Sequence, residues 1–478
     1  MLTTVAITGA NVVKSIAWCV GVFALFLSSA FAEDAARTGN PPTSGTTTST
    51  QSQDGRWEAI FNEDTRYYWW NSTRGFAYGP TFPTVSVSNL APGTVQIPPV
   101  SRPPVGSGAL LYAPMAFQLT GRPTEDIKSE FLLRGGAANG TQTTAGMSGQ
   151  VATQTDTSVT EKLTYLGFAG LQPFASVSVN MPTGRTVLLG NSAFARMDPD
   201  LVELATYGEG WNIGPTIGVN IPITQTLITS FGFGKTFRGP YYREGAIDPT
   251  TSLQGLSRLG PGDASTVNAT IAYRYGGFVI QGSGSYSTET VTTVDQEPFT
   301  KAGNRALASV TIANAWTGFL SSSITGTYSH SARNKIFDPN VGDLVVEAFN
   351  SNSDTFKAVL DVTVRQDAWS FGPTGSYLYR NNNAWNSTAM EFLPAKTRYS
   401  AGGTAGYAVT DAFSLNARVE RIWIKENTNP DKLIVIPAQN DCLFLCSLAS
   451  FDAIIPGSGV PPVTSTGWMV SLAATAHF

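Results

Sequence analysis

Apolar side chains recur at every second residue over most of this chain, in pairs of segments joined by short turns. The clearest pair runs from Trp211 to Ile221, turns at residues 222–225, and returns from Leu227 to Phe237. Four further pairs follow between residues 267 and 419. Alternation at period two predicts β-strands with one apolar face. After residue 32 no apolar run reaches the roughly twenty residues of a membrane-spanning helix. An all-β membrane protein must close its sheet, because an open edge leaves unpaired backbone groups in lipid.

The connections between these pairs are of two kinds. Short turns alternate with long connections, which span residues 182–210, 238–263, 291–303, 331–353, 381–394 and 425–465. Short turns on one rim and long loops on the other are typical of outer-membrane barrels, in which the short rim is periplasmic. Aromatic residues gather beside the short turns and predict an interfacial girdle there: Tyr275, Phe278, Trp316, Phe319, Trp369, Phe413 and Phe478.

The two ends of the chain agree with export to an outer membrane. The first 32 residues contain one cation, an apolar stretch from Ile16 to Leu27, and Ala30-Phe31-Ala32, the order of a secretory signal peptide. A membrane anchor is the alternative, but the stretch is too short to span a bilayer. At the other end Trp468, Val470, Leu472 and Phe478 share one face of a strand. This resembles the terminal strand of Gram-negative outer-membrane proteins, and the resemblance implies that barrel-assembly machinery reads the final aromatic residue.

These observations predict a transmembrane, antiparallel, up-and-down β-barrel of about fourteen strands, within a range of 12–16. Twelve strands follow from Leu171 onward, and Gly146–Thr155 and Thr157–Phe168 supply two more. The expected organisation is a signal peptide (1–32), a disordered lead (33–55), a periplasmic or plug segment (56–142) and the barrel (143–478). If Leu110–Thr120 and Glu130–Arg134 enter the wall, the count is sixteen.

The charged residues suggest a polar interior. Alternation places Arg274, Lys357, Asp361, Arg398, Arg418 and Glu420 on the inner face. A charge that faces lipid at mid-membrane costs about 2–4 kcal/mol, which favours this assignment. The inner charges either line a water-filled passage or form ion pairs that fill a closed barrel. Lys235 and Arg421 fall on apolar faces near the long-loop rim, where they reach headgroups or lipopolysaccharide phosphates, unless a bulge shifts the local register.

Composition excludes several classes of function. Charged residues are 13% of the chain, with 30 basic against 34 acidic, and no basic block indicates a nucleic-acid surface. Cys442 and Cys446 are the cysteines left after signal cleavage, and a disulfide is their simplest use in an exported protein. We expect no metal and no cofactor, because the two histidines, His330 and His477, lie elsewhere.

An enzyme is the least expected function. Ser329-His330-Ser331 is superficially similar to the motif of outer-membrane lipid hydrolases, but His330 and Ser331 point to opposite faces of a strand. The contact between nucleophile and base that hydrolysis requires is therefore not supplied locally.

Two short segments carry a family resemblance. Residues 176–184, Ser-Val-Ser-Val-Asn-Met-Pro-Thr-Gly, and the hairpin from Gly214 to Thr224 resemble outer-membrane transporters for long-chain fatty acids and aromatic hydrocarbons, including the phenol meta-pathway relatives. The resemblance implies fourteen strands, an N-terminal plug and uptake of hydrophobic or aromatic molecules. The function expected overall is a channel or transporter for small molecules. The alternative is a surface-exposed structural or adhesive barrel, suggested by the apolar residues around Cys442 and Cys446.

Overall fold

The computed structural model of the chain describes most of the chain from residue 57 to the C-terminal residue. The described residues are 57–72, 106–144, 147–168, 170–195, 197–204, 206–247, 254–338, 340–386, 392–427, 434–436, 453–455 and 463–478. The expected signal peptide, the disordered lead and the Cys442/Cys446 pair lie outside them. No helix among the described residues is long and apolar enough to cross a membrane.

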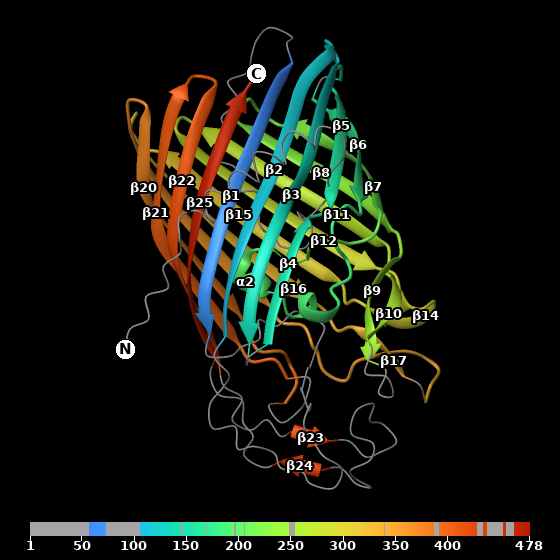
Figure 1. Ribbon diagram of the computed structural model, residues 1–478. Coiled ribbons are helices and arrows are strands. Elements are labelled where there is room, and N and C mark those ends of the chain that lie inside the picture. Colours follow the sequence, from blue (N-terminus) through green and yellow to red (C-terminus); the bar gives the residue numbers. More distant parts are fainter. Residues whose placement is uncertain are drawn as a thin grey trace, which may run out of the picture.

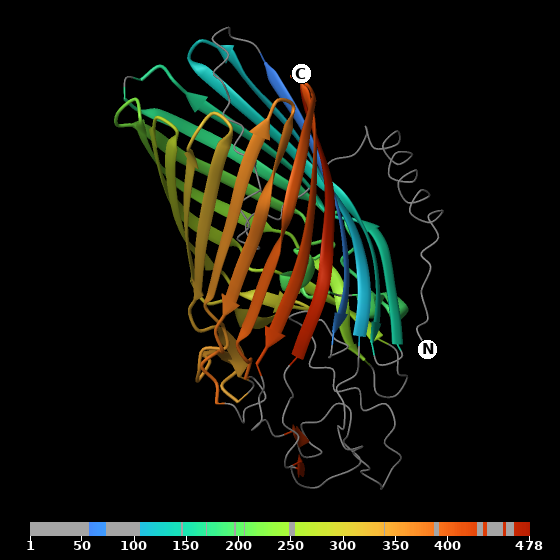
Figure 2. The same ribbon diagram turned by 90° about the vertical axis from the view of Figure 1, so that its left-hand side faces the viewer.

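One antiparallel sheet closes on itself to form a barrel (Figures 1 and 2). It contains seventeen strands, and because β4 and β5 both pair with β3 it closes as sixteen wall positions. Closure is made by the pairing of β1 with β25. The wall strands are β1 (Glu58–Ser72), β2 (Gly106–Thr124), β3 (Ile127–Thr144), β4 (Met147–Gln154), β5 (Thr157–Tyr165), β6 (Gln172–Met181), β7 (Asn212–Pro222), β8 (Leu227–Arg238), β11 (Ala264–Tyr275), β12 (Phe278–Glu289), β15 (Arg305–Ala315), β16 (Leu320–Ser331), β19 (Thr355–Gln366), β20 (Trp369–Arg380), β21 (Lys396–Thr410), β22 (Phe413–Glu426) and β25 (Val463–His477).

The prediction of an all-β closed barrel is confirmed, but the count of fourteen strands is wrong and the alternative of sixteen is right. The twelve strands expected after Leu171 are all present. Residues 147–154 and 157–165, expected as two adjacent strands, lie end to end along β3 and fill one position. The short link between them, Thr155 and Asp156, could be taken for a hairpin turn in the sequence, whereas only the pairing with β3 shows that the chain continues in the same direction.

The other three wall strands come from the segment expected under or inside the barrel. Strand β1 contains the aromatic cluster, with Tyr68 and Trp70 buried inside the barrel and Tyr67 and Trp69 more than a third exposed on the outside. Four consecutive aromatics hide the period-two pattern, because the inner face of this sector is covered by protein and is as apolar as the outer face. The proline-rich residues 80–104 lie outside the described part of the chain.

Adjacent tryptophans of β1 provide a test of this wall position. The Trp70 side chain is 5% exposed, whereas that of Trp69 is 38% exposed and faces outward. We expect Trp70→Ala to lower the free energy of unfolding by about 3–5 kcal/mol, since it opens a cavity in packed protein. Trp69→Ala should cost clearly less, because lipid can fill the space. Urea titration of both variants refolded in vesicles measures the difference, and equal losses would contradict the assignment.

Two aromatic girdles mark the lipid-facing band of the barrel. Five of the seven aromatic residues predicted beside the short turns are exposed there, for example Tyr275 and Phe478, and Phe278 and Phe413 are partly exposed. A second row lies on the outer face about eight residues further along the strands, and Tyr377 is eight residues from Trp369. At about 3.3 Å per residue and a tilt near 40° this is roughly 20 Å, close to the apolar band of about 25 Å in such barrels. The second row contains Tyr286, Tyr328, Phe356, Tyr377, Tyr399 and Trp468.

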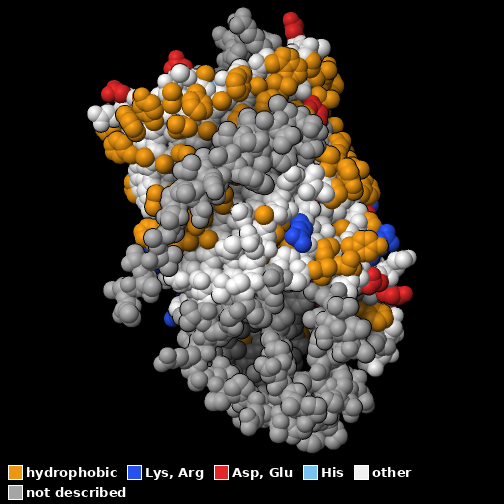
Figure 3. Space-filling model, viewed as in Figure 1, with side chains coloured by type: hydrophobic (Ala, Val, Ile, Leu, Met, Phe, Trp, Pro, Cys, Tyr) orange, Lys and Arg blue, Asp and Glu red, His pale blue; other side chains and the backbone are white. Residues whose placement is uncertain are grey.

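Both ends of the described wall meet at the short-turn rim. The backbone N–H of Phe478 donates to the carbonyl of Ala59 over 2.9 Å, and the N–H of Ala59 donates to the carbonyl of Phe478 over 3.2 Å. Figure 3 shows hydrophobic side chains gathered over the upper half of the barrel, toward this rim. The terminal residues Trp468, Leu472 and Phe478 are exposed on the outer face, while Val470 is partly exposed on the same face.

Beyond the other rim, long connections form a second sheet. This sheet has six strands in the order β18-β17-β14-β13-β10-β9, and it is visible at the lower right of Figure 1. Three consecutive connections contribute a hairpin each. The strands are β9 (Tyr241–Ile247), β10 (Gln254–Gly260), β13 (Thr292–Val294), β14 (Glu297–Lys301), β17 (Lys335–Asp338) and β18 (Asp343–Val346). A further pair, β23 (Ile434–Ile436) and β24 (Ala453–Ile455), belongs to the last long connection.

Candidate functional site: the charged lumen

The connection between β6 and β7, residues 182–211, folds into the barrel and is called the inward segment here (Figure 1). It carries a short 3-10 helix, η1 (Gly190–Ala195), and a single helical turn, α2 (Pro199–Val202). Its buried apolar residues are Leu188, Ala195, Met197, Leu201, Val202, Leu204 and Tyr207. They pack against the inner face of one wall sector, through Tyr68, Trp70, Leu110, Ala138, Val151, Ile422, Ile424 and Met469. This connection therefore fills part of the barrel interior.

The base of the inward segment is fastened to the wall by Asp156, at the link between β4 and β5. One carboxylate oxygen of Asp156 accepts from the backbone N–H of Gly184 over 2.8 Å, and the other accepts from the N–H of Glu209. The Asn180 side chain donates to the same carboxylate over 3.1 Å and to the carbonyl of Gly210 over 2.9 Å. A Cβ on Gly184 would overlap the carbonyl of Tyr207, so the two ends of the segment lie side by side.

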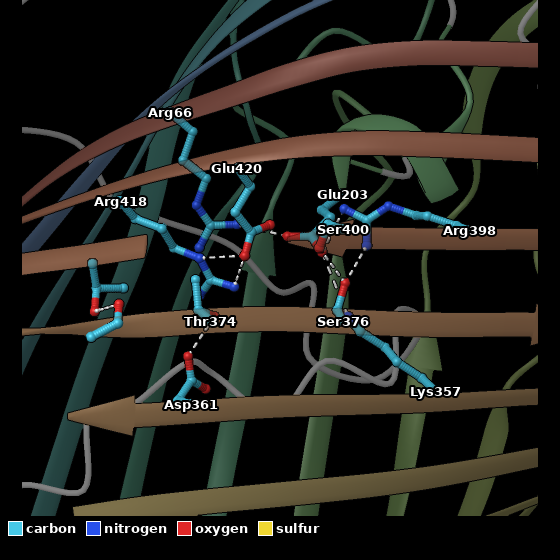
Figure 4. A network of polar contacts seen from close by, with 12 residues as sticks. Arg66, Glu203, Lys357, Asp361, Thr374, Ser376, Arg398, Ser400, Arg418 and Glu420 are labelled. Carbon is cyan, nitrogen blue, oxygen red and sulfur yellow. Dashed lines mark hydrogen bonds and ion pairs between the residues drawn. The ribbon is translucent and has the colours of Figure 1, made fainter. Parts of the chain in front are cut away.

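The tip of the inward segment places one carboxylate, Glu203, among three cations of the wall (Figure 4). Its oxygens lie 3.3 Å from Nη1 of Arg66, 3.5 Å from Nζ of Lys357 and 3.8 Å from Nη2 of Arg398. Burial alone would raise the pKa of the Glu203 carboxyl, but the positive charges of Lys357, Arg398 and Arg66 outweigh it and lower the pKa to about 2. Glu203 is therefore charged throughout the physiological range.

A second ion-pair cluster holds the start of α2. The ammonium of Lys396, almost fully buried, lies 2.6 Å from Asp198 and 2.9 Å from Asp200. Nη1 of Arg380 is 3.6 Å from Asp200. Asp198 also caps the helical turn by accepting from the N–H of Asp200 over 2.9 Å. Burial opposes ionisation of Asp200, but Lys396 and Arg380 lower the pKa of its carboxyl.

Three other predicted lumen residues lie in the same network. Nη2 of Arg418 is 2.5 Å from Oε1 of Glu420, which is 2% exposed. Asp361 accepts from the hydroxyl of Thr374 over 2.6 Å. Nη1 of Arg398 donates to the hydroxyl of Ser376 over 3.1 Å. The structure thus brings together five of the six predicted residues, directly or through shared neighbours.

Arg274 is the sixth, and it lies apart from this network. It stands one residue before the end of β11 at the short-turn rim, where its side chain is exposed. The period-two pattern correctly predicted that Arg274 is on the inner face of its strand. It did not predict how far along the barrel axis the residue lies.

Several charged members of the site were missed by the sequence reasoning. Lys396 has the same parity as Arg398 in β21, so the period-two pattern could have found it. Arg66 belongs to β1, which was not taken for a wall strand. Asp198, Asp200 and Glu203 lie in a connection without strand periodicity, and no signal in the sequence showed that this connection turns inward.

The described charged residues of this ion-pair network have a formal net charge of zero. Six cations, Arg66, Lys357, Arg380, Lys396, Arg398 and Arg418, face six anions, Asp64, Asp198, Asp200, Glu203, Asp361 and Glu420. All of them lie on β1, β19–β22 or the inward segment. This ion-pair network is therefore charged but formally neutral.

The opposite side of the lumen is lined by hydroxyl and amide groups. Inner-face residues of β11, β12, β15 and β16 include Thr266, Asn268, Thr270, Gln281, Ser283, Ser309, Thr311, Thr325 and Thr327. Pairs of hydroxyls bridge neighbouring strands, at 2.9 Å between Thr311 and Thr325 and 3.3 Å between Ser309 and Thr327. Thr270 and Ser283 are exposed. Polar groups that no described segment covers are suited to contact with water.

The two exceptions to the alternation, Lys235 and Arg421, face outward as their parity requires. The pairings of β8 with β11 and of β22 with β25 run without a register shift at these positions. Nζ of Lys235 lies 4.6 Å from the ring centroid of Phe237, and the guanidinium of Arg421 lies 5.1 Å from that of Trp468. The alternative of a local bulge is therefore wrong.

Metal ligation has no basis in the part of the chain that the structure describes. No group of three or more His, Cys, Asp or Glu side chains there is arranged to hold an ion. The two histidines pair instead with carboxylates, His330 with Asp354 at 2.6 Å and His477 with Glu58 at 3.6 Å.

Comparison with known proteins gives matches among solved structures. No protein-family model matches the chain, and no curated protein matches it. A FadL homologue from Pseudomonas aeruginosa is 11% identical, with a TM-score of 0.40 over 88% of this chain and 90% of that one. OmpF of Salmonella typhi, in complex with daunomycin, is 12% identical, with a TM-score of 0.34 over 89% and 98%. An outer membrane channel from Pseudomonas putida F1 is 14% identical, with a TM-score of 0.32 over 57% and 88%. The strand pairings themselves establish the closed barrel.

Proposed function

We propose that this protein is an outer-membrane channel through which small molecules diffuse. Its wall has sixteen positions, and barrels of sixteen strands are wide enough to leave an aqueous passage. The lipid-facing band between two aromatic girdles supports a membrane location, and the long connections face outward if the short-turn rim is periplasmic. Barrel-assembly machinery is the expected partner for insertion, through the terminal residues Trp468 to Phe478.

A single observation carries this proposal. The apolar residues of the inward segment pack on one wall sector, while Thr270 and Ser283 on the inner face of β11 and β12 are exposed. A barrel that was merely filled would have its polar inner groups paired across the interior. Exposed Thr270 and Ser283 favour a passage over an ion-pair filling.

The chemistry of this lining suggests the class of solute. Formal charges cancel in the ion-pair network, and the middle of the wall sector β11–β16 offers hydroxyl donors and acceptors. We therefore expect small, polar, uncharged solutes to pass most readily, with weak preference between small cations and anions. Uptake of hydrophobic or aromatic molecules, implied by the family resemblance, is the alternative, and it requires an apolar path.

Planar-bilayer recording and liposome swelling test the proposal. The refolded mature chain should give stable single-channel steps and admit neutral sugars up to a size limit. Selective swelling with small aromatic alcohols and none with sugars would favour the hydrophobic alternative. No conductance and no swelling from a folded barrel would contradict a channel of either kind.

An enzymatic role has less support than a channel. In β16 the register places Ser329 and Ser331 on the inner face, where Ser331 is paired with Arg305, and His330 on the outer face. Nδ1 of His330 contacts Asp354, not a serine. The arrangement among the described residues does not bring a nucleophile to this base.

A surface role is the second candidate, and the six-stranded sheet favours it. Phe299, Phe337 and Val346 lie on β14, β17 and β18 of this sheet and are 40–56% exposed. Exposed apolar groups beyond the membrane band can bind another surface. We expect deletion of residues 336–345 to abolish attachment of expressing cells to a surface under this alternative. Attachment can be counted in a flow cell, and an unchanged count would contradict it.

A further inference from the structure

Arg421 is a cation on the lipid-facing side of the barrel. Its neighbours in the register are Ala401 on β21 and Trp468 on β25, both on the outer face. The guanidinium lies over the Trp468 ring and is only partly exposed. Among the residues that the structure describes, no carboxylate pairs with it. Lys235, the comparable outward cation, lies 3.9 Å from Asp263.

The height of Arg421 places it at the end of the apolar band. It is eight residues from Phe413 at the short-turn rim, which corresponds to roughly 20 Å along the membrane normal. A cation at mid-membrane would cost about 2–4 kcal/mol, but near an interface the cost falls to about 0–1 kcal/mol. Arg421 thus lies where lipid headgroups begin on the long-loop side.

Two groups of aromatic rings lie on either side of Arg421 at this level. Trp69 stacks on Trp468 with ring centroids 6.3 Å apart, and Tyr399 stacks on Trp423 at 5.6 Å. Tyr67 lies 5.5 Å from Trp69. Arg421 lies between the two groups, beside Trp468 and two residues before Trp423. The rings hold the guanidinium on the outer surface rather than allowing it to fold inward.

Above these rings the outer face becomes polar. Lys425 follows Arg421 by four residues on the same face and is exposed. The register pairs it with Thr464 and Thr397, and pairs Trp423 with Thr466. A ligand bound here meets an apolar surface on the membrane side and two cations and hydroxyl groups on the outer side.

From this arrangement we propose that Arg421 and Lys425 bind the phosphate group of a phosphorylated glycolipid in the outward-facing leaflet. Guanidinium recognises phosphate with two parallel hydrogen bonds, and such charge-assisted bonds are strong where water is scarce. The headgroup phosphate supplies the negative charge that the described protein does not. The acyl chains continue down the apolar band below Arg421, alongside Val419 and Val470. This site lies on the opposite side of the wall from the channel lumen and does not depend on it.

Native mass spectrometry of the refolded mature chain tests the site, with bis-phosphorylated lipid A as the probe. We expect one or more bound molecules on the wild type and about tenfold weaker binding to Arg421→Gln, the loss of about 1.4 kcal/mol. Arg421→Lys should retain part of the affinity because it keeps the charge. Lys235→Gln is the matched control and should bind as the wild type does, since its charge has a carboxylate partner.

Lipids with different headgroups show whether the phosphate is the group that the site recognises. Lipid A without phosphates should bind to the wild type as weakly as the phosphorylated form binds to Arg421→Gln. Vesicles of phosphatidylglycerol should compete weakly, and vesicles of phosphatidylcholine less, if a phosphodiester with net negative charge suffices, and this still supports a phosphate site. Equal binding of phosphorylated lipid A to the wild type and Arg421→Gln overturns the proposal. So does a wild-type barrel dimer that Arg421→Gln dissociates, since these rings would then lie at an interface between two copies.

Discussion

Channels that lack residues 187–206 are expected to conduct about two- to threefold more current than the wild type, because a sixteen-position barrel without its inward segment has a wider lumen. The deletion can be made with a short Gly-Ser linker. Gly184 and Glu209 both donate to Asp156, so the ends to be joined already lie side by side. Single-channel recording in planar bilayers measures the change. Swelling assays should show a larger size limit for neutral sugars.

Two controls make this result interpretable. The variant must migrate as a folded, heat-modifiable barrel, since it uncovers apolar wall residues such as Tyr68 and Leu110. Deletion of residues 336–345, which removes most of the β17–β18 hairpin beyond the rim, should leave the conductance unchanged. A folded barrel whose conductance is unaffected by loss of the inward segment would show that the segment does not narrow the passage.

Neutralising Glu203 is expected to shift ion selectivity toward anions, and neutralising Lys357 to shift it toward cations. The two groups are 3.5 Å apart in a network whose formal charges cancel, so either change alters the charge of this network by one unit. At about 5 Å in water a unit charge contributes about 0.8 kcal/mol, or roughly a fourfold change in local counter-ion concentration. Reversal potentials in a potassium chloride gradient should therefore move in opposite directions for Glu203→Gln and Lys357→Gln.

The double variant separates charge from structure. With both groups neutral the network has the same net charge as in the wild type, and the reversal potential should return close to the wild-type value. Shifts of the same sign in both single variants would instead indicate that each merely loosens the inward segment. The open-state noise of the recordings reports such loosening independently.

Acidification gives a further readout of the Glu203 charge. Its pKa is lowered to about 2, so the ion pairs it makes are present above the ordinary value for a glutamate and are lost as the pH falls through about 2. The difference in reversal potential between the wild type and Glu203→Gln should therefore persist from pH 7 to about 3 and fall to about half near pH 2. A difference that disappears near the ordinary glutamate value would mean that the three cations do not hold this carboxylate.

The sequence predicted most of the barrel wall but little of what lies inside it. Period-two alternation found the twelve strands after Leu171, since each has one face toward lipid and one toward a polar lumen. It failed at β1, where Tyr68 and Trp70 face protein instead of water and both faces are apolar. It also failed at Asp156, because a break within a strand and a turn between strands have the same local residues. Five inner charges of the network were found on strands, where parity applies, although Lys396 and Arg66 on strands were overlooked, and the charges of the inward segment were missed because parity does not apply there.

What the sequence by itself determined is therefore the local and repetitive part of the protein. Alternation specifies strands, turn lengths specify which strands are neighbours, and side-chain parity specifies the outer face, because each depends on residues close together in the chain. Only the tertiary structure decided that β1 closes the barrel against β25, and that Glu203 lies within 3.3–3.8 Å of Arg66, Lys357 and Arg398. The contacts of Glu203 join residues that are 137 to 195 positions apart in the chain, and β1 and β25 are separated by still more. Such contacts form because packing inside a closed barrel depends on the whole wall and not on any one strand.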